Sequence, residues 1–173
     1  MPRRGHWKVD NRLVKAMVSV ITAVTAATVL VGSPVQAVNS CSEYQSIEFE
    51  TPGYNTDLRV RLCLTHGSPT RGGYAQVSWE NGGDNTSDGS RKFDELVIGY
   101  RLIAMNVAVT EGECDLAERV NQSETGLFLC PAAYHRSTDR GAWGVDGTLD
   151  YNLDRDGAGS KRITLTPTPI VEN

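Results

Sequence analysis

The sequence predicts an all-β protein, an antiparallel β-sandwich with one short helix and two disulfides. Three observations carry this prediction. Apolar and polar residues alternate over many short segments, turn-forming residues separate these segments, and no strand–helix–strand repeat or glycine-rich phosphate loop occurs. A length of 173 residues suits one domain.

The N-terminus has the features of a secretory signal peptide, residues 1–37. A basic stretch precedes the uncharged run 16–31, and Val35 and Ala37 place small residues where signal peptidase reads them. The run is shorter than the roughly 20 residues that a membrane-spanning helix needs. We therefore expect cleavage after Ala37, secretion without a membrane anchor, and a single mature domain of residues 38–173.

All four cysteines lie in the mature part, and an even count in an exported chain predicts two disulfides. The favoured pairing is Cys41 with Cys63 and Cys114 with Cys130, because each bridge closes a short loop. The two other pairings stay open from the sequence alone. No Cys-x-x-Cys motif occurs, so the bridges are expected to be structural rather than catalytic.

The first half of the mature chain predicts a hairpin and a third strand. Ile47 and Phe49 alternate with polar residues, and a turn at 51–55 separates them from a second alternating run at 58–64. Pairing of these runs around the turn brings Cys41 close to Cys63, which supports the first disulfide. A third alternating run covers 75–79.

The second half predicts a loop, four more strands and the helix. Residues 81–90 have the composition of a loop. Strands are predicted at 93–102, 125–130, 143–153 and 163–165, before a proline-rich tail. Residues 115–118 have the pattern of a capping box, which predicts one short helix ending near Asn121.

The charge balance argues against nucleic acid as a partner. The whole chain has 17 basic and 21 acidic residues, and cleavage after Ala37 would remove five bases but only one acid, which leaves the mature domain more acidic still. Binding to nucleic acid depends on basic patches that release counterions from phosphates. We expect other secreted proteins as partners instead.

Asn152, Asp154 and Asp156 are the candidate metal ligands. They place oxygen atoms at alternate positions before Gly157, as in the first half of a calcium loop. Ile163 stands where a closing glutamate would be needed, and no helices flank the segment. The alternative is a plain hairpin turn. Calcium is therefore the one cofactor under consideration.

Asp146, Asp150 and Asp154 lie on one face of the predicted strand 143–153 and are candidate interface residues. They form either an acidic docking face for a basic partner or a solvated face, with Arg162 on the next strand as an ion-pair partner. Val38, Asn39 and Ser40 are the other interface candidates, since an extended end can add a strand to a partner's sheet. Their alternative is a frayed terminus.

Catalysis is not expected. The mature part keeps two histidines without metal-ligand spacing, and no Gly-x-Ser-x-Gly elbow is present. Glycoside hydrolysis needs only a pair of carboxylates, but a sandwich of this size has little room for a deep cleft beside its core.

The segment Cys130-Pro131-Ala132-Ala133-Tyr134, followed by Val145-Asp146-Gly147, resembles the reactive loop of subtilisin inhibitors secreted by actinobacteria. The resemblance implies a protease inhibitor with the bond between Ala132 and Ala133 as its reactive bond. The chain departs from that family because no cysteine follows Cys130, so the bridge that braces the family's loop cannot form in the same way.

Four segments together resemble small exported β-proteins of actinobacteria: residues 59–63 (RVRLC), 93–102, 113–116 (ECDL) and 143–157. Within that group, the size and lack of a catalytic set are similar to the adaptor subunits of umbrella-toxin particles. The resemblance implies a protein that binds two partners in a secreted toxin assembly used in antagonism between bacteria. An adaptor, a protease inhibitor, and a calcium- or carbohydrate-binding module are the three functions in competition.

Overall fold

The computed structural model describes residues 38–67, 69–83 and 90–172. The predicted signal peptide and most of the predicted loop at 81–90 lie outside these residues. Within the described part of the chain, no helix is long and apolar enough to cross a membrane.

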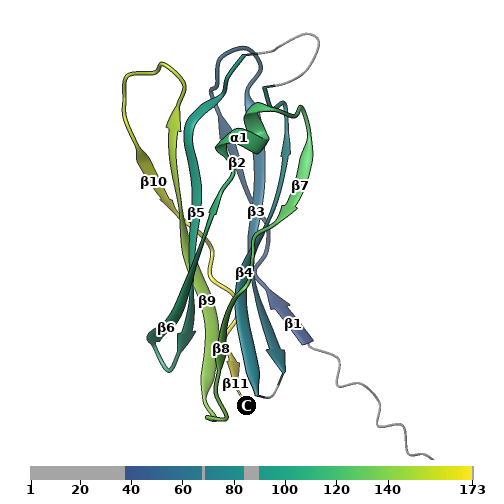
Figure 1. The fold of residues 1–173 in the computed structure, drawn as a ribbon, viewed down its shortest axis with the longest axis vertical. Coiled ribbons are helices and arrows are strands. Elements are labelled where there is room, and N and C mark those ends of the chain that lie inside the picture. The colour runs from purple at the N-terminus through teal and green to yellow at the C-terminus, as the bar shows by residue number, and fades with distance from the viewer. Residues whose placement is uncertain (1–37, 68, 84–89, 173) are drawn as a thin grey trace, which may run out of the picture. The chain divides into compact units, whose positions relative to one another are not determined.

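Two antiparallel sheets enclose one core, so the predicted β-sandwich is confirmed (Figure 1). Sheet A has β3 and β4 at its centre, with β1 and β2 along the outer side of β3 and β7 and β8 along the outer side of β4. Its strands are β1 (Val38–Cys41), β2 (Gln45–Phe49), β3 (Thr56–Gly67), β4 (Thr70–Glu80), β7 (Gly126–Leu129) and β8 (Ala133–Arg136).

Sheet B has the strand order β10–β9–β5–β6, and β11 also pairs with β9. The helix α1 follows β6 and leads to β7, so it carries the chain from sheet B back to sheet A. These elements are β5 (Phe93–Ala104), β6 (Val107–Asp115), α1 (Ala117–Asn121), β9 (Ala142–Leu153), β10 (Lys161–Thr164) and β11 (Val171–Glu172).

The core is made by the inward residues of the alternating runs. Leu58, Leu62 and Leu64 of β3 are fully buried, as are Leu96 and Ile98 of β5 in the opposite sheet. Each such side chain contributes about 1.5–3 kcal/mol relative to leaving it in water. The period-two pattern therefore predicts both the strands and the face that each strand buries.

Both predicted disulfides are confirmed. Cys41 of β1 and Cys63 of β3 are direct neighbours in the ladder, with Cα atoms 4.0 Å apart. Cys114 lies near the C-terminal end of β6, and Cys130 directly follows β7. The bridge between them joins sheet B to sheet A. The first bridge holds a terminal strand in its sheet, and the second connects the two layers.

Four strands were not predicted, namely β1, β6, β8 and β11. β6 has the sequence VAVTEGECD. Its pairing with β5 shifts register between Leu102 and Ile103 of β5, which interrupts the alternation along β6, so the period-two signal fails there. The other three have two to four residues and lie at sheet edges, where pairing with a neighbour rather than side-chain pattern decides the structure.

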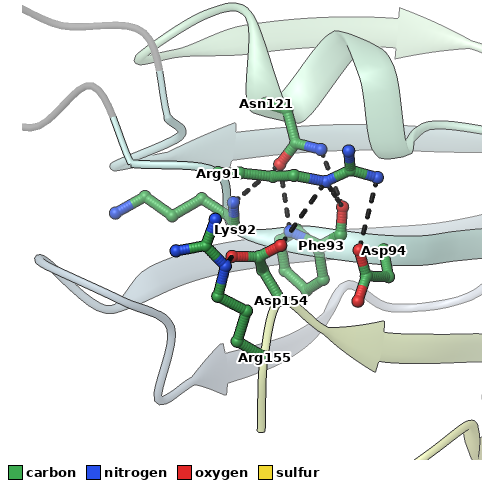
Figure 2. Close-up of polar contacts among 7 residues, drawn as sticks. All are labelled: Arg91, Lys92, Phe93, Asp94, Asn121, Asp154 and Arg155. Carbon is green, nitrogen blue, oxygen red and sulfur yellow. Dashed lines mark hydrogen bonds and ion pairs between the residues drawn. The ribbon is translucent and has the colours of Figure 1, made fainter.

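The capping box predicted for the helix is wrong in its detail. The Asp115 carboxylate accepts the Ala117 N–H at 3.0 Å, and Leu116 occupies the cap position without a side-chain hydrogen bond. Asn121 then fixes the end of α1: its Oδ1 accepts the N–H groups of Lys92 and Phe93, and its Nδ2 donates to the Phe93 carbonyl (Figure 2).

Candidate functional site

The predicted acidic row on β9 is paired with arginines of its own sheet. Arg162 of β10 makes two hydrogen bonds to the Asp150 carboxylate, at 2.5 and 2.8 Å. Arg101 of β5 does the same with Asp146, at 2.9 and 2.6 Å. The expectation that Arg162 is an ion-pair partner of this face is confirmed. These two carboxylates already have cationic partners, which leaves less charge to offer a basic protein.

The ion pairs also affect protonation. The hydrogen bonds from Arg162 hold the pKa of the Asp150 carboxyl below its ordinary value. The hydrogen bonds to Asp146 raise the pKa of the Arg101 guanidinium. Both effects favour the charged forms. At physiological pH these two ion pairs on the outer face of sheet B therefore consist of charged side chains, and each pair has no net charge.

Two of the three candidate calcium residues, Asp154 and Asp156, lie in the turn between β9 and β10, and both carboxylates face cationic side chains. Asp154 lies between Arg91 and Arg155, at 3.7 and 3.5 Å, and its side chain is 13% exposed (Figure 2). Asp156 accepts the Ala158 N–H at 2.8 Å and lies 3.5 Å from Lys161. The predicted hairpin between β9 and β10 is present.

Asn152, the third candidate ligand, is the residue of β9 that pairs with Glu95 of β5. Among the described residues, no group of three or more His, Cys, Asp or Glu side chains is placed to hold a metal ion. Calcium binding stays a prediction that the geometry of these residues does not favour.

The N-terminal interface candidates already belong to a strand of the molecule. Val38, Asn39 and Ser40 lie in β1 and pair with His66, Thr65 and Leu64 of β3. The backbone of this segment therefore fills one edge of sheet A. This segment can add to a partner's sheet only through the side of β1 that does not pair with β3, or by separating from β3.

The predicted reactive bond also lies against the sheet. Ala133 begins β8 and pairs with Gly73 of β4, and Ala132 is half-buried beside it. The Tyr100 hydroxyl donates to the carbonyl of Pro131 just before this bond. A protease needs extended residues on both sides of the bond, and here the residues on one side are held by β4.

Three large apolar side chains are exposed on the outer face of sheet A. Leu127 and Leu129 of β7 are 65% and 58% exposed, and Tyr134 of β8 is 62% exposed. A Cβ atom on Gly72 would overlap the Tyr134 ring on one side and meet the Thr65 methyl group on another. We call Leu127, Leu129 and Tyr134 the sheet A apolar edge.

An arginine–tyrosine cluster lies on the β3 side of the same face. The guanidinium carbons of Arg59 and Arg61 lie 4.9 and 4.5 Å from the centre of the Tyr44 ring. Arg61 also donates from Nε and Nη2 to Gln76 Oε1, at 3.0 and 2.8 Å. Within the described part of the chain neither arginine has a carboxylate partner, so two oriented positive charges face solvent.

A groove of about 700 Å³ lies beside this cluster, because Arg59 is among the residues that line it. Its lining includes small residues from three strands, Ser46, Ser78 and Gly126. Gly126 is needed here because a Cβ atom would overlap the Trp79 ring. The lining also includes a row of carboxylates from Glu48, Asp57 and Glu80, which are neighbours in the ladder.

A second exposed apolar surface lies at the turn between β5 and β6. Met105 and Val107 are 59% and 63% exposed. Met105 and Asn106 both have positive φ, 48° and 65°, as in a tight hairpin turn, and the Met105 N–H donates to the Ala142 carbonyl at 2.9 Å. The turn is therefore firmly held while its side chains face solvent.

Neither apolar surface was predicted as a site from the sequence. Leu127-Phe128-Leu129 carried a usable signal, because it is apolar at three successive positions and so apolar on both faces of a strand. One of those faces must be exposed in a two-layer fold. Arg59 and Arg61 sat in the recognised RVRLC segment, but only the folded chain brings Tyr44 to them.

Comparison with protein-family models, curated proteins and solved structures finds no match to this chain. The surfaces of the domain itself are therefore the ground for proposing a function.

Proposed function

We propose that this chain is a secreted, non-catalytic protein-binding module, an adaptor subunit that joins other secreted proteins in an extracellular complex of the toxin type. The sheet A apolar edge carries this proposal. Leu127, Leu129 and Tyr134 are each more than half exposed on one face of β7 and β8, two short strands that follow each other along the same side of β4. Monomeric proteins place few large apolar side chains together in water, and such patches mark interaction surfaces.

The composition of the rest of the face supports the same function. Tyrosine and arginine are enriched where protein interfaces bind most strongly. Tyr44 holds both Arg59 and Arg61, and Gln76 holds Arg61, so these two side chains would lose little conformational entropy when a partner contacts them. In an acidic domain this cluster is a local positive surface, suited to carboxylates of a partner.

An adaptor needs two surfaces. Met105 and Val107, at the β5–β6 turn, provide the second one, and β7 lies away from this turn in the sandwich (Figure 1). Secretion is supported by the two disulfides, which form and persist in oxidising compartments.

The test is quantitative capture of secreted proteins from the native culture supernatant, with mass spectrometry of what co-purifies. We expect two large partners at fixed stoichiometry with the natural chain. The triple variant Leu127→Ser, Leu129→Ser, Tyr134→Ser should lose one partner and keep the other. The double variant Met105→Ser, Val107→Ser should do the reverse.

The control is the double variant Arg101→Gln, Asp146→Asn, which removes a neutral ion pair from sheet B. It should capture both partners at the natural level. Recovery of the natural chain alone, or equal capture by all four chains, would overturn the proposal.

A further inference from the structure

β7 is an edge strand whose outer side is open. It pairs with β4, and among the described residues no other strand pairs with it. In Figure 1, β7 lies at the margin of its sheet, beyond β4. We propose that an extended segment of a partner protein adds to this side of β7 as a further antiparallel strand, with apolar residues beside Leu127 and Leu129 and an acidic residue beside Arg119. This inference rests on the proposed function and names how the partner binds.

The hydrogen-bonding groups of the open side follow from the ladder. The Cys130 N–H donates to the Ala75 carbonyl at 2.9 Å, so Cys130 forms a hydrogen-bonded pair with β4. Such pairs alternate along an antiparallel ladder. Gly126 and Phe128 therefore also bond to β4, and the N–H and C=O groups of Leu127 and Leu129 point toward the open side.

The side chains determine the pattern of the added strand. The residues beside Leu127 and Leu129 place their side chains on the outer face, where apolar groups would cover both leucines. The residue beside Phe128 points to the opposite face. There the Arg119 guanidinium lies over the Phe128 ring, 4.1 Å from its centre. Among the described residues Arg119 has no carboxylate partner, so the expected pattern is apolar–acidic–apolar.

The strand is fixed in place before any partner arrives. The Cys114–Cys130 bridge anchors its C-terminal end to sheet B. At the other end the Trp79 indole donates to the Ser123 carbonyl at 3.1 Å, and the Gly82 N–H donates to the Glu124 carbonyl at 2.8 Å. An edge already held in strand geometry costs a partner little ordering entropy.

A second copy of this chain fits the same edge poorly. Two copies of β7 pairing antiparallel about Phe128 would bring the two Arg119 guanidinium groups to the same face of the joint sheet. Like charges beside each other oppose association. β7 also has four residues, which limits the interface that an edge-to-edge dimer could bury. The charge on Arg119 favours an acidic segment of a different protein.

The first experiment uses synthetic dodecapeptides with a central Val-Glu-Val or Val-Lys-Val triplet in the same Ser/Thr frame. They are titrated into the isotope-labelled mature chain with intact disulfides. We expect the Leu127 and Leu129 amides to gain protection from hydrogen exchange on peptide binding. The Val-Glu-Val peptide should bind about fivefold more tightly than Val-Lys-Val at low salt, and Arg119→Gln should abolish that difference.

The second experiment uses Leu129→Pro, which removes the outward N–H but none of the bonds to β4. Proline is tolerated on the open side of an edge strand. Its control, Leu129→Thr, keeps the N–H and loses the apolar side chain. We expect Leu129→Pro to lose peptide binding fully and Leu129→Thr to lose part of it. If Leu129→Pro does not fold, Leu127→Pro, judged by its near-UV circular dichroism, replaces it.

Absence of peptide binding at millimolar concentration, or protection of amides other than those of β7, would overturn strand addition. Capture of native partners separates this failure from failure of the proposed function. If Leu129→Pro captures partners as the natural chain does, while the sheet A triple variant does not, protein binding stands and strand addition falls. If no chain captures a partner, both fall.

Discussion

The hydroxyl of Tyr100 in β5 donates a hydrogen bond to the carbonyl oxygen of Pro131, in the link between β7 and β8. It is a side-chain bond from sheet B to the edge of sheet A, one residue after the Cys114–Cys130 bridge. Tyr100 is fully buried, and burial raises the pKa of its phenol. The edge that carries the apolar leucines is thus held by a covalent link and a polar link side by side.

The Tyr100 bond predicts a loss of stability at alkaline pH. Because the folded pKa is raised above the ordinary value near 10, the contribution of the neutral phenol is full below that pH and is lost as the pH rises toward the folded pKa. Tyr100→Phe should lower the free energy of unfolding by about 0.5–1.5 kcal/mol at pH 7.

The measurement is urea unfolding of the natural chain and Tyr100→Phe from pH 7 to 11. The difference between the two should shrink above pH 10. Absorbance titration should show one tyrosine that ionises at a higher pH than the others and that the variant lacks. A constant difference across this range would mean that Tyr100 ionises as freely in the folded chain as in the unfolded one.

Gly112 is required by the ring of Tyr100. A Cβ atom on Gly112 would overlap that ring, whereas a Cβ on Gly99, on the outer face of the neighbouring strand, meets nothing closer than Thr148 Oγ1 at 3.7 Å. Gly112→Ala should cost about 1–3 kcal/mol of unfolding free energy, since extra volume in a packed core forces its neighbours to move.

Gly99→Ala is the matched control and should be neutral or slightly stabilising, because alanine restricts the unfolded chain more than glycine does. Thermal unfolding of both variants measures the effect. Equal melting temperatures for the two would contradict the packing described around Tyr100.

The two disulfides should contribute similar free energies with different local consequences. The bridges span 16 and 22 residues, for which chain entropy predicts about 3 kcal/mol each. Replacing Cys41 and Cys63 by serine should release β1 alone, so amide exchange should rise in 38–41. Replacing Cys114 and Cys130 should raise exchange in both β6 and β7. Confinement of that rise to one of these strands would contradict the role of the bridge as a link between sheets.

The sequence predicts the central strands well because their pattern and their burial have one cause. β3, β5 and β9 each bury one side, and alternation along them reports that directly. The edge strands escape prediction since β1 and β8 are four residues long and are set by pairing with β3 and β4.

The candidate site follows the same division. Asp150 and its partner Arg162 were within reach of pattern reasoning, because both lie on paired strands of one predicted hairpin. The meeting of Tyr44 with Arg61 was not, since Tyr44 lies between β1 and β2 and its place depends on an edge strand that the pattern does not show. Surfaces assembled from edges and connections need the three-dimensional fold.

Lys92 offers the sharpest test of how the loop end of the sandwich is held. It is fully buried, and its ammonium donates to the carbonyls of Pro52 and Tyr54 at 2.6 and 3.0 Å. These carbonyls belong to the turn between β2 and β3, where Thr51 Oγ1 also donates to the Tyr54 carbonyl. Lys92→Met keeps the length and loses the donors, so we expect a cost of about 1.5–3 kcal/mol in urea unfolding.

The control is Lys161→Met, an exposed lysine 3.5 Å from Asp156, which should change stability by less than about 0.5 kcal/mol. The two effects on Lys92 act in opposite directions: its hydrogen bonds stabilise the turn, and removal of its charge from water destabilises the fold. A Lys92→Met chain as stable as the natural one would mean that desolvation cancels the bonds. A marked loss, with faster amide exchange at 51–55, would show that the buried ammonium organises this turn.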